Sequence, residues 1–152
     1  MAVSLAFGAV MLAQTGSSQE KEMLAAHNAV RKRVGVPPLV WSAQLAKAAG
    51  TWAQTLAGNG KFEHQKRNPY GENLFQAMGT TASPTEVVDS WAEEAKNYKY
   101  EKNSCSGTCG HYTQIVWRGT KEVGCASATS GNRQVWACEY NPPGNYVGQR
   151  PY

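Results

Sequence analysis

The chain has 152 residues, of which 41% are hydrophobic and 17% charged, and its formal net charge at pH 7 is +4. A chain of this length forms about one domain, and this composition argues against an intrinsically disordered or repeat protein. The lysines and arginines are scattered instead of gathered in one run, which argues against nucleic-acid binding. We therefore expect one globular, monomeric domain.

The start of the chain has the composition of a leader. The run from Ala2 to Ala13 is apolar and uncharged, as in the central region of a secretory signal peptide, and it is too short to cross a membrane. No basic residue precedes it, so a disordered leader is the alternative. We expect residues 1–18 to be a signal or leader and residues 19–152 to form the single domain of a secreted, extracellular protein without a transmembrane anchor.

Two segments near the start of this domain have the pattern of amphipathic helices. The first covers residues 19–34, where Ser17 and Glu20 can form a capping box. The second begins at Ser42 and ends in the sequence GNG of residues 58–60. Because most of the predicted strands follow the helices instead of alternating with them, we expect an α+β fold.

A third predicted helix places a carboxylate on its buried face. The helix begins in the sequence SPTE, with Ser83 as its N-cap, and is predicted to continue to about Tyr98. Its apolar stripe consists of Val87, Trp91, Ala95 and Tyr98. Glu94 follows Trp91 by three residues, so its side chain points in the same direction. Since burying an unpaired carboxylate costs several kcal/mol, Glu94 needs a partner.

The three histidines are the candidate partners of this carboxylate. His27 lies in the first helical pattern, where a histidine more often makes a structural hydrogen bond than binds a ligand. His64 lies in KFEHQ, and His111 opens the sequence of residues 110–117, GHYTQIVW, which alternates like a strand. Glu72, in YGENLF, is a second carboxylate. Two histidines and two glutamates would form a divalent-metal or acid–base cluster if the fold brought them together.

Four cysteines lie in the last third of the chain, and an even number behind a signal-like segment is typical of disulfide-bonded secreted proteins. A two-residue turn that starts at Gly131 places Cys125 opposite Cys138 in a non-hydrogen-bonded pair, where Cα atoms approach to about 4.5 Å. Cys105 and Cys109 lie in a Gly/Ser loop that could bend to join them. A zinc site is the alternative for that spacing, but no second ligand pair of similar spacing follows.

Several motifs, HNAVR, YGENLF, WAEEAKNY, GHYTQIVW and NPPGNYVGQRPY, occur in one order along the chain. From about residue 19 to residue 152 this sequence resembles the CAP superfamily, which comprises the cysteine-rich secretory proteins, antigen 5 and the plant pathogenesis-related proteins of the first class. The resemblance implies a three-layer α-β-α sandwich with a central, mainly antiparallel sheet. It also implies that a central cleft contains a tetrad of His64, Glu72, Glu94 and His111.

The chain departs from the plant pattern of this family. Plant members have six cysteines, and the two that are absent here align with Gly60 and Ser130, so their joint loss leaves a consistent set of two pairs. Gln65 follows the first tetrad histidine where plant members often have serine. Glu139 replaces the usual asparagine ahead of the segment from which plant members release a signalling peptide, a cleavage that would fall before Pro142 here.

Three functions are compatible with the predicted cleft. We favour a secreted, non-enzymatic module in antimicrobial defence that binds a sterol or lipid, meets a microbial or host surface and requires no cofactor. The second is a hydrolase in which His64 and His111 hold a divalent cation such as zinc and Glu72 or Glu94 activates water. The third is a purely structural hydrogen-bonded tetrad. Since the chain has neither a GxSxG nor an HExxH motif, the sequence does not favour an enzyme.

Overall fold

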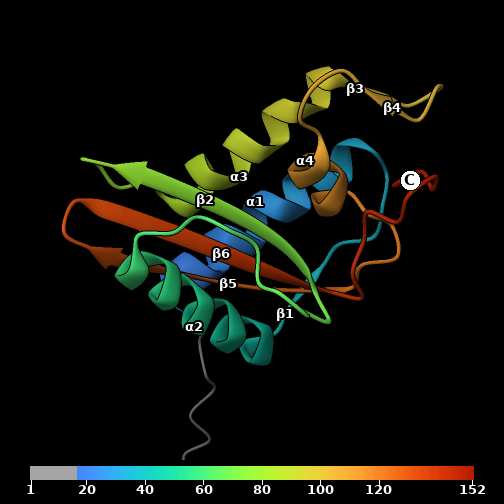
Figure 1. The fold of residues 1–152 in the computed structure, drawn as a ribbon. Helices are drawn as coiled ribbons and strands as arrows, with labels where there is room; N and C mark the ends of the chain where they lie inside the picture. Colours follow the sequence, from blue (N-terminus) through green and yellow to red (C-terminus); the bar gives the residue numbers. More distant parts are fainter. Residues whose placement is uncertain (1–16) are drawn as a thin grey trace, which may run out of the picture.

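The computed structural model describes residues 17–152, which form three layers (Figure 1). Helix α2 covers one face of a four-stranded sheet, and helices α1, α3 and α4 lie on the other face. In chain order the elements are α1 (Ser18–Arg33), β1 (Val40–Trp41), α2 (Ala43–Asn59), β2 (Gly71–Met78), α3 (Pro84–Ala92), the 3-10 helix η1 (Glu93–Asn97), β3 (Tyr98–Lys99), β4 (Ser104–Cys105), α4 (Gly110–Ile115), β5 (Glu122–Ser130) and β6 (Arg133–Asn141). The predicted α+β sandwich is confirmed.

The start of α1 coincides with the end of the predicted leader. Ser17 is the N-cap of this helix and forms a capping box with Glu20, as the sequence predicts. Apart from Ser17 and Ser18, the predicted leader of residues 1–18 lies outside the described residues. No helix in the described part of the chain is both long enough and apolar enough to span a bilayer.

The sheet has the strand order β1-β5-β6-β2, and only the short β1 runs parallel to its neighbour. The β5–β6 hairpin turns at Gly131, whose φ of 58° lies in the region that glycine adopts without strain. Cys125 is in register with Cys138, and the two form a disulfide whose Cα atoms lie 4.1 Å apart. The predicted hairpin and its disulfide are confirmed.

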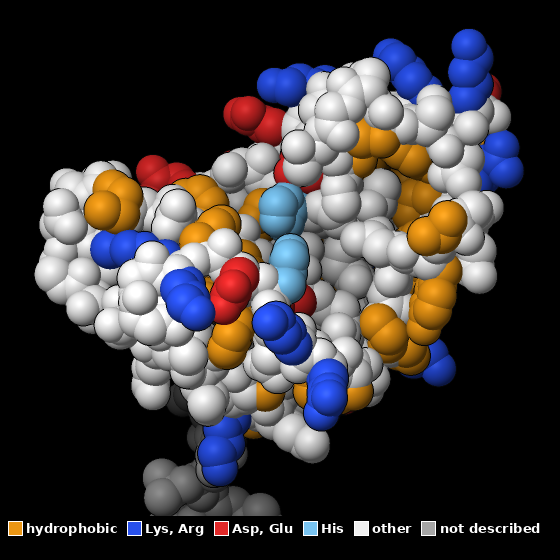
Figure 2. Space-filling view, viewed as in Figure 1, with side chains coloured by type: hydrophobic (Ala, Val, Ile, Leu, Met, Phe, Trp, Pro, Cys, Tyr) orange, Lys and Arg blue, Asp and Glu red, His pale blue; other side chains and the backbone are white. Residues whose placement is uncertain are grey.

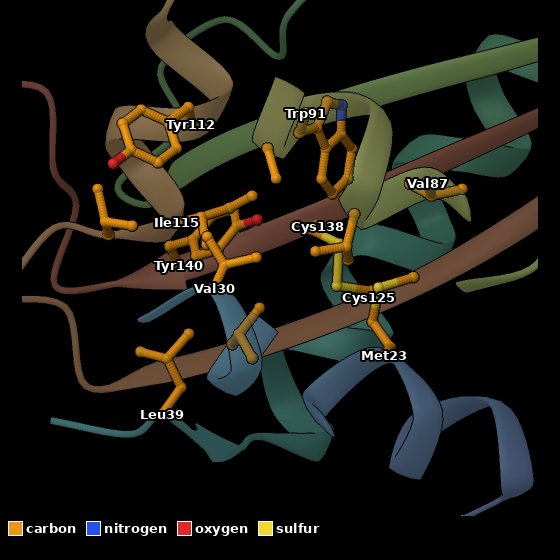
Figure 3. Packing of buried hydrophobic residues seen from close by; sticks show 14 of the residues in the cluster. Met23, Val30, Leu39, Val87, Trp91, Tyr112, Ile115, Cys125, Cys138 and Tyr140 are labelled. Atoms are coloured by element: carbon orange, nitrogen blue, oxygen red, sulfur yellow. A yellow bond between two sulfur atoms is a disulfide. The ribbon is translucent and has the colours of Figure 1, made fainter. Parts of the chain in front are cut away.

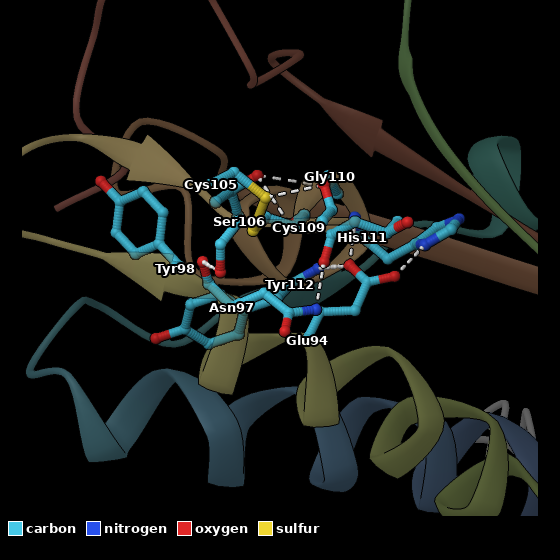
Figure 4. The surroundings of a disulfide bond; sticks show 12 residues. Glu94, Asn97, Tyr98, Cys105, Ser106, Cys109, Gly110, His111 and Tyr112 are labelled. Carbon is cyan, nitrogen blue, oxygen red and sulfur yellow. Dashed lines mark hydrogen bonds and ion pairs between the residues drawn. A yellow bond between two sulfur atoms is a disulfide. The ribbon is translucent and has the colours of Figure 1, made fainter.

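The second disulfide joins Cys105 of β4 to Cys109, with 6.1 Å between the Cα atoms. It connects the small β3–β4 ribbon to the residue that precedes α4 (Figure 4). Because both sulfur atoms are used in this bond, the zinc alternative for these two cysteines is wrong.

Hydrophobic clusters lie on both faces of the sheet. The larger cluster surrounds the Cys125–Cys138 disulfide and includes Met23 of α1 and Trp91 of α3 (Figure 3). The smaller one packs α2 against Leu74 and other residues of β2 and β6. Since side chains alternate along a strand, β6 is buried on both faces, and eight of its nine residues are buried. Polar residues in this strand are therefore buried as well.

Residues 110–117 differ most from the sequence-based expectation. Their alternation predicts a strand, but residues 110–115 form α4, and the buried Tyr112 and Ile115 follow helical spacing. The backbone N–H groups of His111 and Tyr112, which have no partner within so short a helix, donate to the carboxylate of Glu94. This long-range contact is invisible to a local pattern, so the strand prediction is wrong.

The third helix is also shorter than its apolar pattern predicts. The α-helical hydrogen bonding ends at Ala92, and residues 93–97 form the tighter 3-10 helix η1. As a result Ala95 is exposed instead of buried, whereas Glu94 remains partly buried. The predicted continuation to Tyr98 is wrong, but the capping box of Ser83 at the start of α3 is confirmed.

Gly124 provides a test of how α2 packs on the sheet. A Cβ atom at this position would collide with the backbone nitrogen of Ala46 and lie 2.5 Å from the backbone oxygen of Ser42. We expect Gly124→Ala to lower the free energy of unfolding by about 2 kcal/mol or more, because the backbone of α2 would have to move. Urea denaturation measures this change.

Gly58 of α2 supplies the matched control, because a Cβ atom there meets nothing within 4 Å. Gly58→Ala should raise the free energy of unfolding by about 0.5–1 kcal/mol through helix propensity. An unfolding midpoint of Gly124→Ala equal to that of the unmodified protein would contradict the packing described here.

Candidate functional site

His64 and Glu72 form the first of two histidine–glutamate pairs. His64 lies in the segment between α2 and β2, and Glu72 is the second residue of β2. The Nδ1 atom of His64 lies 2.5 Å from Oε1 of Glu72, which also accepts a hydrogen bond from the backbone N–H of Gln65 at 3.2 Å. The hydrogen bond to Glu72 raises the pKa of His64. The imidazole is 65% exposed, whereas the carboxylate is 5% exposed, so the pair presents its histidine to solvent.

His111 and Glu94 form the second pair (Figure 4). The Nδ1 atom of His111 lies 2.6 Å from Oε1 of Glu94. The other carboxylate oxygen accepts hydrogen bonds from the backbone N–H groups of His111 and Tyr112 at 3.0 and 3.1 Å. The indole of Trp91 stacks on the imidazole, with ring centroids 5.9 Å apart and an interplanar angle of 15°. Glu94 therefore has three donors, and His111 is held on both its edge and its face.

The two pairs lie on opposite faces of strand β2. Glu72 shares the face of Leu74, which packs toward α2, whereas Asn73 points to the other face. The Nδ2 group of Asn73 donates to the backbone carbonyl of His111 at 3.1 Å and so connects the strand to the second pair. Figure 2 shows two exposed imidazoles close together beside a hollow in the surface. They belong to these pairs, since the third histidine of the chain is 0% exposed.

The four predicted side chains are thus brought together as two pairs instead of one tight cluster. Within residues 17–152, one set of three ligating side chains has its ligand atoms within 4.8 Å of one another, and this set is His27, Cys125 and Cys138. It is not a metal site, because the two sulfur atoms are joined in a disulfide. A cation bound by the predicted tetrad would have to lie between the imidazoles.

His27 has the structural role that its helical position predicts. Its Nδ1–H donates to the backbone carbonyl of Met23 at 2.8 Å, and its Nε2 atom accepts from the hydroxyl of Tyr140 at 2.8 Å. Burial lowers the pKa of His27 to about 4, so the ring is neutral at physiological pH. Both nitrogens are satisfied inside the protein, and none is left for a ligand.

The tautomers of His64 and His111, which are exposed and partly exposed respectively, determine what they can bind. In each pair a carboxylate accepts the hydrogen bond of Nδ1–H, so the Nε2 atom carries the lone pair in the neutral ring. Metal-binding histidines commonly have this arrangement, in which a carboxylate orients the ring from the other nitrogen. Each of the two rings therefore presents an unprotonated Nε2 atom of the kind that a divalent cation binds.

Comparison with known proteins establishes the family. The model of CAP, the cysteine-rich secretory protein family, matches residues 24–140. The chain belongs to this family. Pathogenesis-related protein 1 of Arabidopsis thaliana is 40% identical over 146 residues, which cover 95% of this chain and 89% of that protein.

Solved structures share the fold. Venom allergen-like protein 4 of Schistosoma mansoni is 30% identical with a TM-score of 0.71, and the match covers 90% of this chain and 95% of that one. NaASP2, solved with Zn²⁺, has a TM-score of 0.69 at 21% identity, with coverage of 90% and 86%. At that identity the second match shows a common fold and nothing further.

Glu139 adds a third carboxyl group to this CAP site. It lies directly opposite Glu72 in the β2–β6 ladder and is 1% exposed. Its Oε2 atom accepts a hydrogen bond from Nδ2 of Asn68 at 2.7 Å, whereas Oε1 is buried without a partner among the described residues. Burial, together with the adjacent carboxylate of Glu72, raises the pKa of Glu139 to about 8. In its protonated form, Glu139 can donate to Glu72 and hold it against His64.

The sequence identified Glu139 as a departure from the plant pattern but did not place it in the site. The register of β2 against β6 joins positions far apart in the chain, so the sequence does not reveal that Glu139 faces Glu72. One local signal was present, because Glu139 stands between Cys138 and Tyr140 in a strand rich in apolar residues. A carboxyl group in such a strand is either paired or protonated.

A pocket of about 530 Å³ lies beside α4 in this CAP domain. The β3–β4 ribbon, the Cys105–Cys109 disulfide and the C-terminal segment surround it, and its aromatic lining residues are Tyr98, Trp117 and Tyr146. The C-terminal segment is held in place by the backbone N–H of Arg118, which donates to the carbonyl of Pro151 at 2.7 Å. The sequence analysis did not predict this pocket, because its walls come from three separate segments.

The raised pKa of Glu139 predicts how stability depends on pH. The ordinary pKa of a glutamate is 4.5, so between this value and pH 8 the folded chain binds more protons than the unfolded chain. The free energy of unfolding therefore falls as the pH rises through this window, and the stabilisation present at low pH is lost once the pH has passed 8. Glu139→Gln removes this dependence. We therefore compare the free energies of unfolding of the variant and the unmodified protein, measured by urea denaturation. We expect the difference between them to shift in favour of the variant by about 1–3 kcal/mol between pH 5 and pH 8.5.

Glu101→Gln is the control for this experiment, because Glu101 is exposed and its replacement also removes one negative charge. Its stability should follow that of the unmodified protein at both pH values. If the free energies of unfolding of Glu139→Gln and of the unmodified protein change equally between the two pH values, Glu139 does not carry a raised pKa.

Proposed function

We propose that this CAP protein is a secreted, extracellular and monomeric binding module for a small apolar molecule of the sterol or lipid class. In this proposal residues 1–18 are its leader, residues 19–152 are its single domain, and the module acts in antimicrobial defence at a microbial or host surface. It requires no cofactor. The observation that carries the proposal is the pocket of about 530 Å³ beside α4.

The lining of this pocket supports an amphipathic ligand. Small-molecule sites generally have volumes of about 300–1,000 Å³ and combine apolar walls with a few polar groups. Trp117 and Tyr146 form an aromatic wall, with ring centroids 6.0 Å apart. Asn103 and Asn145 add amide groups to the lining. A sterol or a lipid has the same combination of a large apolar body and a small polar group.

The hydrogen bonding of the two pairs supports a non-enzymatic role. Glu72 accepts hydrogen bonds from an imidazole and a backbone N–H, and Glu94 accepts three such bonds. A general base must lie within reach of the water that it activates, and these carboxylates, which are 5% and 15% exposed, are directed at histidines. Neither imidazole is hydrogen-bonded to a serine hydroxyl or a cysteine sulfur within residues 17–152, so no activated nucleophile accompanies them.

Sterol binding can be tested with dehydroergosterol, whose fluorescence is excited by energy transfer from nearby tryptophan. We expect saturable binding with transfer from Trp117. Tyr146→Ala should weaken it roughly tenfold, because the variant removes half of the aromatic wall.

Phe62→Ala is the matched control for this experiment, since Phe62 is 45% exposed and lies outside the pocket. Its affinity for the sterol should equal that of the unmodified protein. No saturable binding of dehydroergosterol or of a fluorescent fatty acid would overturn the proposed ligand class. Binding that is equally weakened by both variants would place the ligand elsewhere.

Divalent-cation binding is a second candidate function. The observation in its favour is that carboxylates orient the imidazoles of both His64 and His111 through Nδ1. When bound, such a cation would act as a Lewis acid. The residues of the chain would hold it through His64 and His111, while Glu72 and Glu94 fix the two rings.

Isothermal titration with zinc at neutral pH tests this second function. We expect one-to-one binding that His64→Ala and His111→Ala each weaken at least roughly tenfold, since each variant removes a ligand. Lys66→Ala, an exposed neighbour of His64, is the control and should bind zinc normally.

Absence of a binding heat, together with an unchanged melting temperature in the presence of zinc, would remove this candidate. The purely structural interpretation of the tetrad predicts that outcome together with a lower melting temperature for His111→Ala, because Glu94 would lose its partner.

A further inference from the structure

A second pocket, of about 550 Å³, lies where the end of α1 meets the loop that leads to β1. Its lining consists of Asn28, Lys32, Gly35, Val36, Pro37, Pro38 and Arg118. None of these residues lines the pocket beside α4 or belongs to the two histidine–glutamate pairs. It is therefore a separate cavity, and both apolar residues and two cationic side chains line it.

The cations of this pocket lack negative partners. Lys32 and Arg118 are exposed, and neither forms an ion pair with a carboxylate within the described residues. The pocket lining contains no acidic residue. Two positive charges thus face one concave surface without compensation, a condition that attracts anions.

A third positive charge lies beneath the pocket. Arg31 is 1% exposed, and its guanidinium donates hydrogen bonds only to backbone carbonyls, those of Pro37, Ile115, Trp117 and Thr120. These bonds satisfy its polar atoms but do not neutralise its charge. Burial, with a smaller contribution from the nearby Arg118, lowers the pKa of Arg31 to about 10, so it remains protonated at physiological pH. A buried charge without a counter-ion strengthens the preference of this region for an anion.

We propose that this pocket binds a small organic anion, with its carboxylate between Lys32 and Arg118 and a compact ring body against Pro37 and Pro38. The cationic side chains supply charge-assisted hydrogen bonds. The two proline rings and Val36 supply the apolar contact. This function goes beyond the proposed binding of a sterol or lipid, because it uses a different cavity and requires a negative charge on the ligand.

Naphthalene-2-carboxylate is the probe, and the neutral naphthalene-2-carboxamide is its matched analogue. Titration of ¹⁵N-labelled protein, followed by amide chemical shifts, should give saturable changes for Lys32, Gly35, Val36 and Arg118. We expect the carboxamide to bind at least roughly fivefold more weakly, and the affinity of the carboxylate to fall as salt is added.

The double variant Lys32→Gln/Arg118→Gln should bind the carboxylate at least roughly tenfold more weakly. Lys47→Gln/Lys99→Gln removes the same charge from exposed positions outside the pocket and should bind normally. Equal affinity for the acid and the amide, unchanged affinity in the first double variant, or shifts centred on Tyr146 would each overturn the proposal. The third result would still be compatible with a ligand in the pocket beside α4, so the two proposals can fail separately.

Discussion

A buried series of hydrogen bonds connects helices α1 and α4 to the sheet. It leads from His27 through Tyr140 and Asn73 to the backbone of His111. His27 is a member of α1, Tyr140 of β6, Asn73 of β2 and His111 of α4, so four elements meet in it. The donors and acceptors of these hydrogen bonds are compatible in one arrangement, because the neutral His27 accepts from Tyr140, whose oxygen accepts from Asn73. Such a network specifies how the layer that contains α1 and α4 sits on the sheet.

The candidate site depends on this network because two of its carboxyl groups are adjacent in sequence to members of the network. Glu72 precedes Asn73 and Glu139 precedes Tyr140, so fixing Asn73 and Tyr140 on one face of these strands also fixes the two carboxyl groups on the other face. His111 is positioned through its own backbone carbonyl. The two imidazoles thus approach each other at one edge of the sheet although they belong to different layers. In both pairs the carboxylate orients the histidine. This arrangement is consistent with a binding role for the two imidazoles.

The sequence predicted the features that depend on neighbours in the chain. The capping boxes at Ser17 and Ser83 and the hairpin disulfide of Cys125 follow from local spacing, and the apolar periodicity of the predicted third helix was sufficient to mark Glu94 as a carboxylate in need of a partner. Helix α4 could not be predicted, because its first N–H groups are satisfied by a distant side chain. The contact of Glu139 with Glu72 depends on strand register, which local patterns do not contain.

The most direct test of this account is the tautomer of the imidazoles of His64 and His111, measured by long-range ¹H–¹⁵N NMR at the alkaline end of a pH titration, where the ring signals no longer change with pH. We predict that both His64 and His111 carry their proton on Nδ1, toward Glu72 and Glu94, and that Nε2 is unprotonated. A proton on Nε2 of either ring would show that the carboxylate does not orient it, and would contradict the arrangement on which the candidate site is built.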